Sequence, residues 1–276
     1  MLRVAALQYC ASDDIAKTLH HIQPLISEAA SKANLVVLPE CANYLAESRE
    51  QLNQRAEWDD KSYSQKWLGN MARELGIWLL AGSLIMRRRD NNQLVNRSLL
   101  FGPDGAVVAD YDKIHMFDAD VGDGKRYHES ASFLPGQSPV IAYIDNVPCG
   151  LTICYDIRFA HLYRQLALDG AQVFFVPAAF TARSGKAHWH VLLRARAIET
   201  GCYVVAPAQC GTHADGRKTY GHSLIINPWG EIVAEAEDGD AIIYGALDLS
   251  ATNKAQNAIP SLKTNPVISS TRIIGA

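Results

Sequence analysis

The chain has 276 residues and a formal net charge of −3, with 48% hydrophobic and 20% charged residues. This composition is typical of a globular protein and excludes a disordered, fibrous or coiled-coil chain. The length allows two small domains or one large domain with a single core, and it excludes a miniprotein stapled by disulfides.

Short apolar runs bounded by Gly, Pro, Asn or Asp recur along the chain and predict β-strands. Several runs are apolar nearly from end to end, which is typical of strands that are covered on both faces. The expected strands span residues 3–8, 34–38, 78–83, 94–101, 106–110, 140–144, 150–154, 173–176, 203–206, 223–226, 231–234 and 241–247.

The spacing of apolar residues also predicts two helices. Apolar side chains recur at intervals of three and four over residues 15–29, and a second set marks one helical face over residues 189–197. Gly201 stands where a helix normally ends. Pro24 lies within the first pattern and predicts a kink or a late start, because proline lacks the backbone N–H that a helix uses.

An internal repeat is visible in the sequence. Residues Ser98, Pro103, Gly105, Val108 and Ala109 match Ser223, Pro228, Gly230, Val233 and Ala234, at a constant offset of 125. Each copy predicts a strand, a turn and a returning strand, and a looser match pairs residues 35–40 with 173–178. We therefore expect an α/β fold of two similar halves, stacked as a four-layer α-β-β-α sandwich. No linker separates them, so we expect one domain over residues 1–260 and a C-terminal tail over 261–276.

Several classes of protein are not expected. The six cysteines form no CxxC pair and have no nearby histidine at zinc-ligand spacing, so neither a zinc ribbon nor a redox dithiol is predicted. Basic residues are scattered apart from the run at residues 87–89, which argues against a nucleic-acid partner. No apolar stretch approaches the roughly 20 residues that span a bilayer, and no secretory signal is recognisable. The expected compartment is the cytoplasm.

Three reactive side chains stand directly after apolar strand runs, where α/β proteins usually display their functional groups. Glu40 follows residues 35–39, Lys113 follows the strand near Tyr111, and Cys154 follows residues 150–153. Each could have an ordinary explanation, as a loop carboxylate, a solvated cation or a small buried side chain. Together, an acid, a cation and a thiol suffice for acyl transfer.

The contexts of these residues resemble those of the nitrilase, or carbon–nitrogen hydrolase, superfamily. The matching motifs are Leu38-Pro39-Glu40, Tyr111-Asp112-Lys113-Ile114-His115, and Cys154-Tyr155-Asp156-Ile157-Arg158-Phe159. A further match over residues 127–136 includes Glu129, which in this superfamily is a second active-site glutamate. The resemblance runs from about residue 3 to residue 260 and implies an enzyme with the catalytic residues Glu40, Lys113, Cys154 and Glu129.

The chemistry of these groups suggests how the enzyme would act. An ordinary thiol is mostly protonated at neutral pH, so Cys154 needs a base, for which Glu40 is the candidate. Attack on an amide carbon creates an oxyanion that Lys113 and the backbone N–H of Tyr155 could receive. Ammonia would leave, and water would hydrolyse the thioester. Glu129 beside Lys113 would keep that lysine charged.

Four residues are candidates for substrate binding. Arg158 could hold a substrate carboxylate as a bidentate fork, or it could form a structural pair with Asp156. Tyr155 is a candidate because it directly follows Cys154 in the sequence. Thr181 and Ser184 could contribute hydroxyl contacts to the substrate. The scheme needs no cofactor and no metal, although the alternation of His188 and His190 resembles a metal-ligand pattern.

Within the superfamily, residues 113–118, 187–211 and 220–223 resemble the deaminated glutathione amidases most. That resemblance implies cleavage of a small carboxylate-bearing amide, deaminated glutathione, to 2-oxoglutarate and cysteinylglycine. The alternatives are an ω-amidase acting on 2-oxoglutaramate, a true nitrilase, and a catalytically silent binding module. The resemblance also implies a homodimer or larger homo-oligomer, and no membrane partner is expected.

Overall fold

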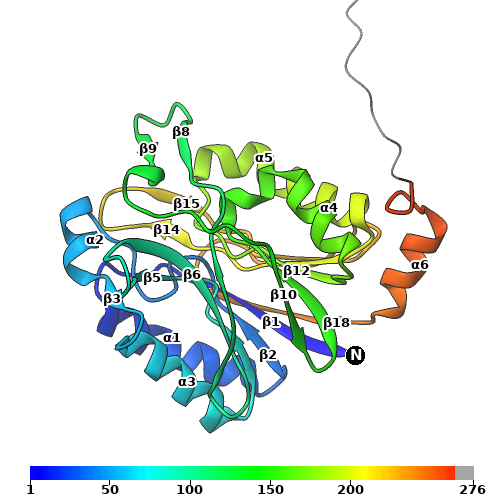
Figure 1. Ribbon diagram of the computed structural model, residues 1–276, viewed down its shortest axis with the longest axis horizontal. Coiled ribbons are helices and arrows are strands. Elements are labelled where there is room, and N and C mark those ends of the chain that lie inside the picture. Colours follow the sequence, from blue (N-terminus) through cyan, green and yellow to red (C-terminus); the bar gives the residue numbers. More distant parts are fainter. Residues whose placement is uncertain (265–276) are drawn as a thin grey trace, which may run out of the picture.

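The computed structural model describes residues 1–264, in which two β-sheets stack face to face between layers of helices (Figure 1). The expected tail lies outside the described residues from residue 265 onward. The first sheet contains β1 (Leu2–Gln8), β2 (Leu35–Val37), β3 (Glu57–Trp58), β4 (Trp78–Leu80), β5 (Leu84–Arg87), β6 (Leu94–Phe101), β7 (Val107–Asp112) and β18 (Ala241–Leu247). Its strand order is β18-β1-β2-β4-β6-β5-β3, and β7 pairs with β6.

The second sheet has the order β10-β11-β12-β13-β16-β17. These strands are β10 (Val140–Ile144), β11 (Val147–Leu151), β12 (Val173–Phe175), β13 (Tyr203–Ala206), β16 (Leu224–Ile226) and β17 (Ile232–Glu235). Two small hairpins stand apart from the sheets: β8 (Asp118–Asp120) with β9 (Arg126–His128), and β14 (Cys210–Thr212) with β15 (Lys218–Tyr220).

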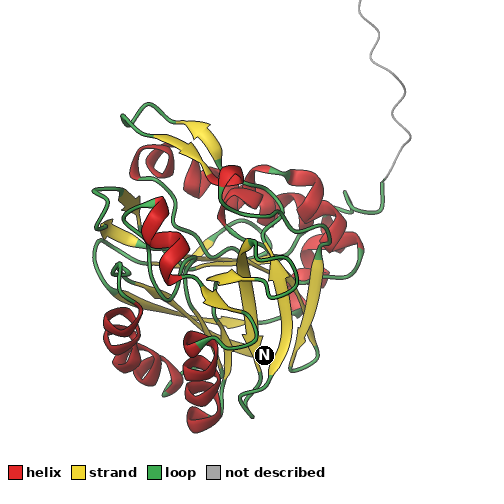
Figure 2. Ribbon diagram, turned by 60° about the vertical axis from the view of Figure 1, so that its left-hand side comes forward, coloured by secondary structure: helices red, strands yellow, loops and turns green. Residues whose placement is uncertain are grey.

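Helices cover the outer faces of both sheets (Figure 2). The helices are α1 (Ile15–Ala30), α2 (Arg49–Arg55), α3 (Tyr63–Leu75), α4 (Ala160–Leu168), α5 (Ala182–Thr200) and α6 (Ser250–Ala258), with short 3-10 turns η1 (Glu129–Ala131) and η2 (Cys154–Arg158). Helices α1 and α3 pack on the first sheet, and α4 and α5 pack on the second. The expected α-β-β-α sandwich is therefore confirmed. None of the helices in residues 1–264 is long and apolar enough to cross a membrane.

The alternation of side chains along a strand explains the stacking. In β2, Leu35 and Val37 point into the core between the two sheets, whereas Val36 joins the cluster formed with α1 and α3. All three side chains are fully buried. Because successive residues of a strand face opposite sides, an uninterrupted apolar run can be buried only between two covering layers.

The two halves repeat the same sheet. Strands β18, β1, β2, β4, β6 and β7 pair in the same sequence of parallel and antiparallel directions as β10, β11, β12, β13, β16 and β17. A register shift falls between Leu100 and Phe101 in one hairpin and between Ile225 and Ile226 in the other, 125 positions later. Even the irregularity of the hairpin is thus duplicated, and the two similar halves are confirmed.

Two local expectations about element bounds need correction. Helix α1 shows no late start, because the Asp14 side chain accepts a hydrogen bond from the Lys17 N–H at 3.0 Å and fixes the helix start at Ile15. Pro24 stays inside α1. The carbonyl group it leaves without a helical partner belongs to the exposed residue His20, where water can serve instead. The strand expected over residues 150–154 ends at Leu151.

Candidate active site

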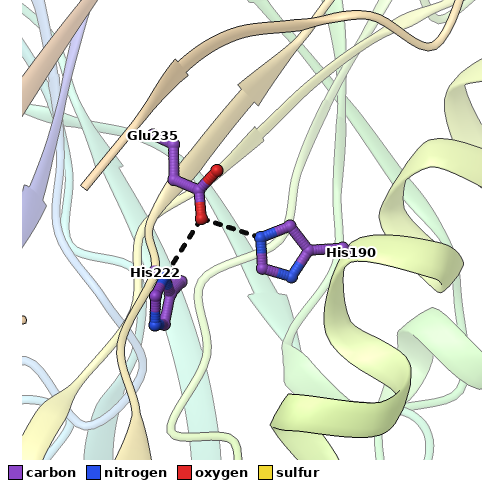
Figure 3. Close-up of side chains that lie close together, drawn as sticks. All are labelled: His190, His222 and Glu235. Carbon is purple, nitrogen blue, oxygen red and sulfur yellow. Dashed lines mark hydrogen bonds and ion pairs between the residues drawn. The ribbon is translucent and has the colours of Figure 1, made fainter. Parts of the chain in front are cut away.

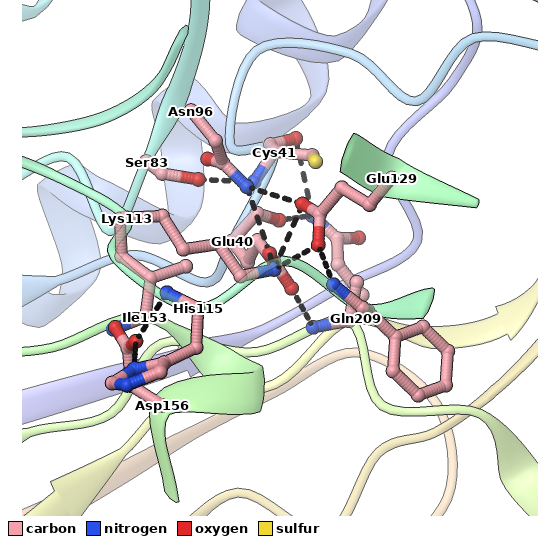
Figure 4. A network of polar contacts seen from close by, with 12 residues as sticks. Glu40, Cys41, Ser83, Asn96, Lys113, His115, Glu129, Ile153, Asp156 and Gln209 are labelled. Atoms are coloured by element: carbon pink, nitrogen blue, oxygen red, sulfur yellow. Dashed lines mark hydrogen bonds and ion pairs between the residues drawn. The ribbon is translucent and has the colours of Figure 1, made fainter. Parts of the chain in front are cut away.

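Glu40, Lys113 and Glu129 form a buried ion-pair cluster (Figure 4). The Lys113 ammonium lies 2.9 Å from Glu40 Oε1 and 2.8 Å from Glu129 Oε2. Lys113 is only 2% exposed and Glu40 only 4%. Breaking such a buried pair by removing one partner is costly, because it leaves the other charge uncompensated.

Cys154 lies at the first position of the turn η2, beside this cluster. Its backbone adopts a left-handed conformation, with φ at +46°, which is costly for a residue other than glycine. Its N–H donates to Pro177 O at 2.9 Å. Cys154 lines the same cavity as Glu40 and Lys113, so the three side chains lie around one space.

Asp156 joins the turn η2 to the segment that carries Lys113. Its fully buried carboxylate accepts from Ile153 N at 2.9 Å and from the Tyr111 hydroxyl at 2.7 Å. It also accepts from His115 N at 3.1 Å and lies 2.7 Å from His115 Nδ1. Because Tyr111 and His115 flank Lys113, one carboxylate fixes the lysine backbone relative to the turn that holds Cys154.

Glu129 reaches the site from η1, which follows the β8–β9 hairpin. Its Oε2 atom accepts the N–H of Phe117 at 2.6 Å and lies 2.8 Å from Lys113 Nζ. Asn96 of β6 donates to Glu40 Oε1 at 2.9 Å and to Glu129 Oε1 at 3.5 Å. The two carboxylates are therefore held apart by a lysine and an amide that both donate to them.

Before substrate binds, the electrostatics of the site favour the carboxylate form of Glu40, the ammonium form of Lys113 and the thiol form of Cys154. Burial alone would raise the pKa of Glu40, but the charge and hydrogen bond of Lys113, with the N–H of Ala179, hold this pKa below its ordinary value. Burial would lower the pKa of Lys113, but Glu129 and Glu40 raise it well above its ordinary value. Burial and the charge of Glu40 raise the pKa of the Cys154 thiol. Such a site can move a proton from sulfur to carboxylate as a bond forms.

A cavity of about 430 Å³ opens onto these groups. Glu40, Lys113, Glu129 and Cys154 all line it. The lining also includes the cations Arg49, Arg126 and Arg217 and the acids Glu47 and Asp215. The size is sufficient for a small molecule.

Comparison with known proteins identifies the family to which the chain belongs. The family model for carbon-nitrogen hydrolases matches residues 3–257. The chain belongs to the carbon–nitrogen hydrolase family.

The chain is 40% identical to a deaminated glutathione amidase from Synechocystis, over 94% of this chain and 96% of the relative. It is 34% identical to the omega-amidase NIT2 of Xenopus tropicalis, over 94% and 92%. The crystal structure of Nit3 from Saccharomyces cerevisiae, a nitrilase-superfamily member, matches with a TM-score of 0.85 and 31% identity, over 94% of each chain. The chain is thus a hydrolase acting on carbon–nitrogen bonds of amides.

The substrate-binding candidates of this carbon–nitrogen hydrolase lie outside the lining of the cavity. Arg158 lies with its guanidinium over the rings of Tyr155 and Phe180, and its Nη2 is 3.3 Å from His188 Nδ1. Thr181 and Ser184 are buried and hydrogen bond to each other at 2.7 Å. The alternative partner of Arg158, Asp156, is occupied by other donors.

Sequence reasoning missed two residues that position Glu40. Asn96 is the first of three consecutive polar residues, Asn96 to Ser98, that interrupt the apolar run of β6, so the pattern marks this stretch but not Asn96 itself. Gln209 is fully buried and donates to the Glu40 carbonyl at 3.0 Å, while its own oxygen accepts from Ala11 N at 2.8 Å. No local pattern distinguishes Gln209, because its partners are about 170 to 200 residues away in the chain.

Proposed function

We propose that Cys154 attacks a carboxylate-bearing linear amide to form a thioester, with Glu40 as base and Lys113 as oxyanion partner. The substrate we favour is deaminated glutathione, cleaved to 2-oxoglutarate and cysteinylglycine. The observation that carries the proposal is the buried Lys113 ammonium held between Glu40 and Glu129 next to the thiol. The 40% identity to a relative named for this activity supports the choice of substrate.

In the first half-reaction, Glu40 takes the proton of Cys154 as sulfur bonds to the amide carbon. The negative charge that forms on oxygen is received by Lys113 and by the Tyr155 N–H. That N–H has no backbone acceptor within residues 1–264, whereas the Cys154 N–H is already bonded to Pro177. Removing one such donor typically costs about 10² to 10³ in rate.

The carbon–nitrogen bond then breaks, and Glu40 returns the proton to the departing nitrogen. With 2-oxoglutaramate the departing group is ammonia, but with deaminated glutathione it is the amine of cysteinylglycine. The expected product of the favoured reaction is therefore a dipeptide and not ammonia. Water next attacks the thioester, Glu40 takes the proton of water, and the thiol of Cys154 is restored.

Substrate recognition has two candidate sources of positive charge. The first is Arg158, which we propose as a substrate contact with Tyr155, Thr181 and Ser184, although none of the four lines the cavity. Arg217 of the cavity wall is a second source, although it is partly neutralised by Asp215, which accepts from it at 3.0 Å. Replacing each arginine by lysine keeps the charge but removes the bidentate fork.

A side-by-side assay tests the function. The purified enzyme is given deaminated glutathione, 2-oxoglutaramate or a simple nitrile, and 2-oxoglutarate, cysteinylglycine and ammonia are measured. We expect the highest kcat/KM with deaminated glutathione, and Cys154→Ala without turnover. A preference for 2-oxoglutaramate would indicate the ω-amidase alternative, which the 34% identity to NIT2 supports. A preference for the nitrile would indicate a true nitrilase.

A catalytically silent binding module remains the alternative of a different class. The retention of Glu40, Lys113, Cys154 and Glu129 in one cluster argues against it. Mass measurement after brief incubation with substrate distinguishes the two, since only an enzyme gains the mass of the acyl group on Cys154. An unchanged mass together with no product in the assay would favour the silent module.

Three wider features belong to the same proposal. We propose that the enzyme works in the cytoplasm without a cofactor and forms a homodimer or larger homo-oligomer. The exposed apolar residues Val191 and Ile198 on α5 support an association surface there. We also propose that residues 1–260 act as one domain, because one core cluster contains residues from both sheets.

A further inference from the structure

Three side chains with metal-binding donor atoms meet outside the catalytic cavity (Figure 3). His190 comes from α5, His222 from the segment between β15 and β16, and Glu235 from the end of β17. His190 Nε2 lies 2.8 Å and His222 Nδ1 3.0 Å from the same oxygen, Glu235 Oε1. One donor atom from each side chain lies within 4.8 Å of the other two. We propose that His190, His222 and Glu235 form a structural Zn²⁺ site.

The donor set suits zinc. Zn²⁺ takes imidazole nitrogen and carboxylate oxygen at about 2.0 to 2.2 Å, usually as four ligands in a tetrahedron. Ligand atoms in such a tetrahedron are about 3.3 Å apart. The two contacts to Glu235, at 2.8 and 3.0 Å, need to lengthen by a few tenths of an ångström, and the two imidazole nitrogens, which lie within 4.8 Å of each other, need to reach the same separation. The side chains of His190 and His222 are 29% and 28% exposed, which allows an ion to enter and water to complete the coordination.

The protonation of the cluster is compatible with a cation. Without metal, each imidazole can hydrogen bond to Glu235 only by donating from the nitrogen that faces it. When Zn²⁺ binds, the ring proton of each neutral imidazole moves to the other nitrogen. Burial would raise the pKa of Glu235, but hydrogen bonds from His190 and His222 hold it below the ordinary value, so the carboxylate is charged at neutral pH.

The backbone holds the two histidines in place. Trp189, fully buried in α5 next to His190, donates its indole N–H to the His222 carbonyl at 2.8 Å. On the other side of His222, Ser223 O accepts the N–H of Ala236, the neighbour of Glu235, at 2.9 Å. All three donor residues are thus tied together by contacts that do not depend on an ion.

His222 also adopts an uncommon conformation. Its φ is +53°, in the left-handed region that is costly for a residue with a Cβ, and its ring stacks on Tyr220 with centroids 4.4 Å apart. Strained backbone persists where the surroundings enforce it, and such positions concentrate at functional sites. The conformation directs the imidazole towards Glu235 instead of solvent.

The sequence pattern had suggested a different pair, His188 with His190. In the structure His188 lies beside Arg158, and His190 contacts His222 and Glu235. A metal there would cross-link α5 to the β16–β17 hairpin. It takes no part in the thioester chemistry, so this inference does not depend on the proposed function.

Zinc binding to the whole chain tests the site. The Cys154→Ala form is used as the parent, because an active-site thiol could itself bind Zn²⁺. We expect one Zn²⁺ per chain by calorimetry and a rise in melting temperature with Zn²⁺ but not with Mg²⁺, which prefers oxygen ligands. An anomalous diffraction signal at the zinc edge, located between the three side chains, would give the position.

Matched variants make the result specific. In the same background, His222→Asn and Glu235→Gln should each weaken Zn²⁺ binding by at least about tenfold, whereas His20→Gln, an exposed histidine on α1, should not. Asparagine is chosen because it tolerates positive φ, and circular dichroism without metal verifies that both variants fold. Equal zinc affinity in the parent and in both variants would overturn the proposal, as would the absence of a zinc-dependent rise in melting temperature.

Discussion

Glu40 is the residue on which most contacts of the ion-pair cluster converge. Its two oxygens accept hydrogen bonds from the Lys113 ammonium, the Asn96 amide and the N–H of Ala179, at 2.9, 2.9 and 2.8 Å respectively. Three donors on a buried carboxylate favour its charged form, and a raised thiol pKa favours the neutral form of Cys154. The proposed base is therefore ionised before the substrate arrives, and the nucleophile is activated only during attack.

This charge arrangement predicts the pH profile of kcat/KM. Because the folded-state pKa of Glu40 lies below its ordinary value of 4.5, the active carboxylate form should persist as pH falls until below about 4.5. Activity should be lost only at lower pH, and Glu40→Gln should be inactive throughout. The measurement is kcat/KM across pH, with circular dichroism at each point to exclude unfolding. An acid limb centred near pH 6 to 7 would contradict the assignment of Glu40 as base.

The segment that carries Glu40 is held by a close approach of two strand ends. Leu38 N donates to Leu80 O at 2.9 Å, and Gly82 passes so near that a Cβ there would overlap the carbonyl oxygens of Leu38 and Pro39. Both contacts are to backbone, which cannot move aside without displacing the β2 end. Glycine at this position is therefore a requirement of the loop that presents Glu40.

Gly82→Ala should accordingly damage both stability and activity. We expect a loss of about 1 to 3 kcal/mol in the free energy of unfolding from the forced shift, and a fall in kcat/KM larger than the fall in folded fraction. Urea denaturation and steady-state kinetics measure the two effects. Gly76→Asn is the control, because Gly76 has φ of +63° and open space around it, and asparagine tolerates that conformation. Wild-type kinetics in folded Gly82→Ala would show that the close approach does not position Glu40.

At the scale of the whole molecule, the proposed catalytic groups come from both halves. Glu40 follows β2 of the first sheet, and Cys154 follows β11 of the second. The inner faces of the two sheets contribute to one core, in which Leu35 and Phe175 belong to the same cluster. Neither half could bury its inner face alone, so we propose that the two halves fold together.

Unfolding should therefore be a single transition. Leu35→Ala, in the shared core, should lower the melting temperature of the entire transition and cost about 2 to 5 kcal/mol. Gln23→Ala, at an exposed position of α1, should change stability by less than about 0.5 kcal/mol. Calorimetry tests this by comparing calorimetric and van't Hoff enthalpies. Two resolved transitions in Leu35→Ala would mean that the halves are separate domains.

The sequence by itself determined the features that depend on neighbours along the chain. The strands over residues 94–101, 140–144, 203–206 and 241–247 were predicted with the bounds observed, because apolar runs and turn residues are local signals. The repeat at an offset of 125 anticipated matching hairpins. The motifs around Glu40, Lys113 and Cys154 identified the cluster before any distance was known.

Only the tertiary structure decided which distant groups meet. Gln209 contacts the Glu40 backbone, and His190 joins His222 and Glu235. Three arginines, Arg49, Arg126 and Arg217, line the cavity, whereas Arg158, the sequence candidate for a carboxylate contact, does not. These contacts join residues 13 to 169 positions apart, and no periodic pattern encodes them. Side-chain partners depend on how two twisted sheets stack, which is settled by burial of the whole core and not by any one segment.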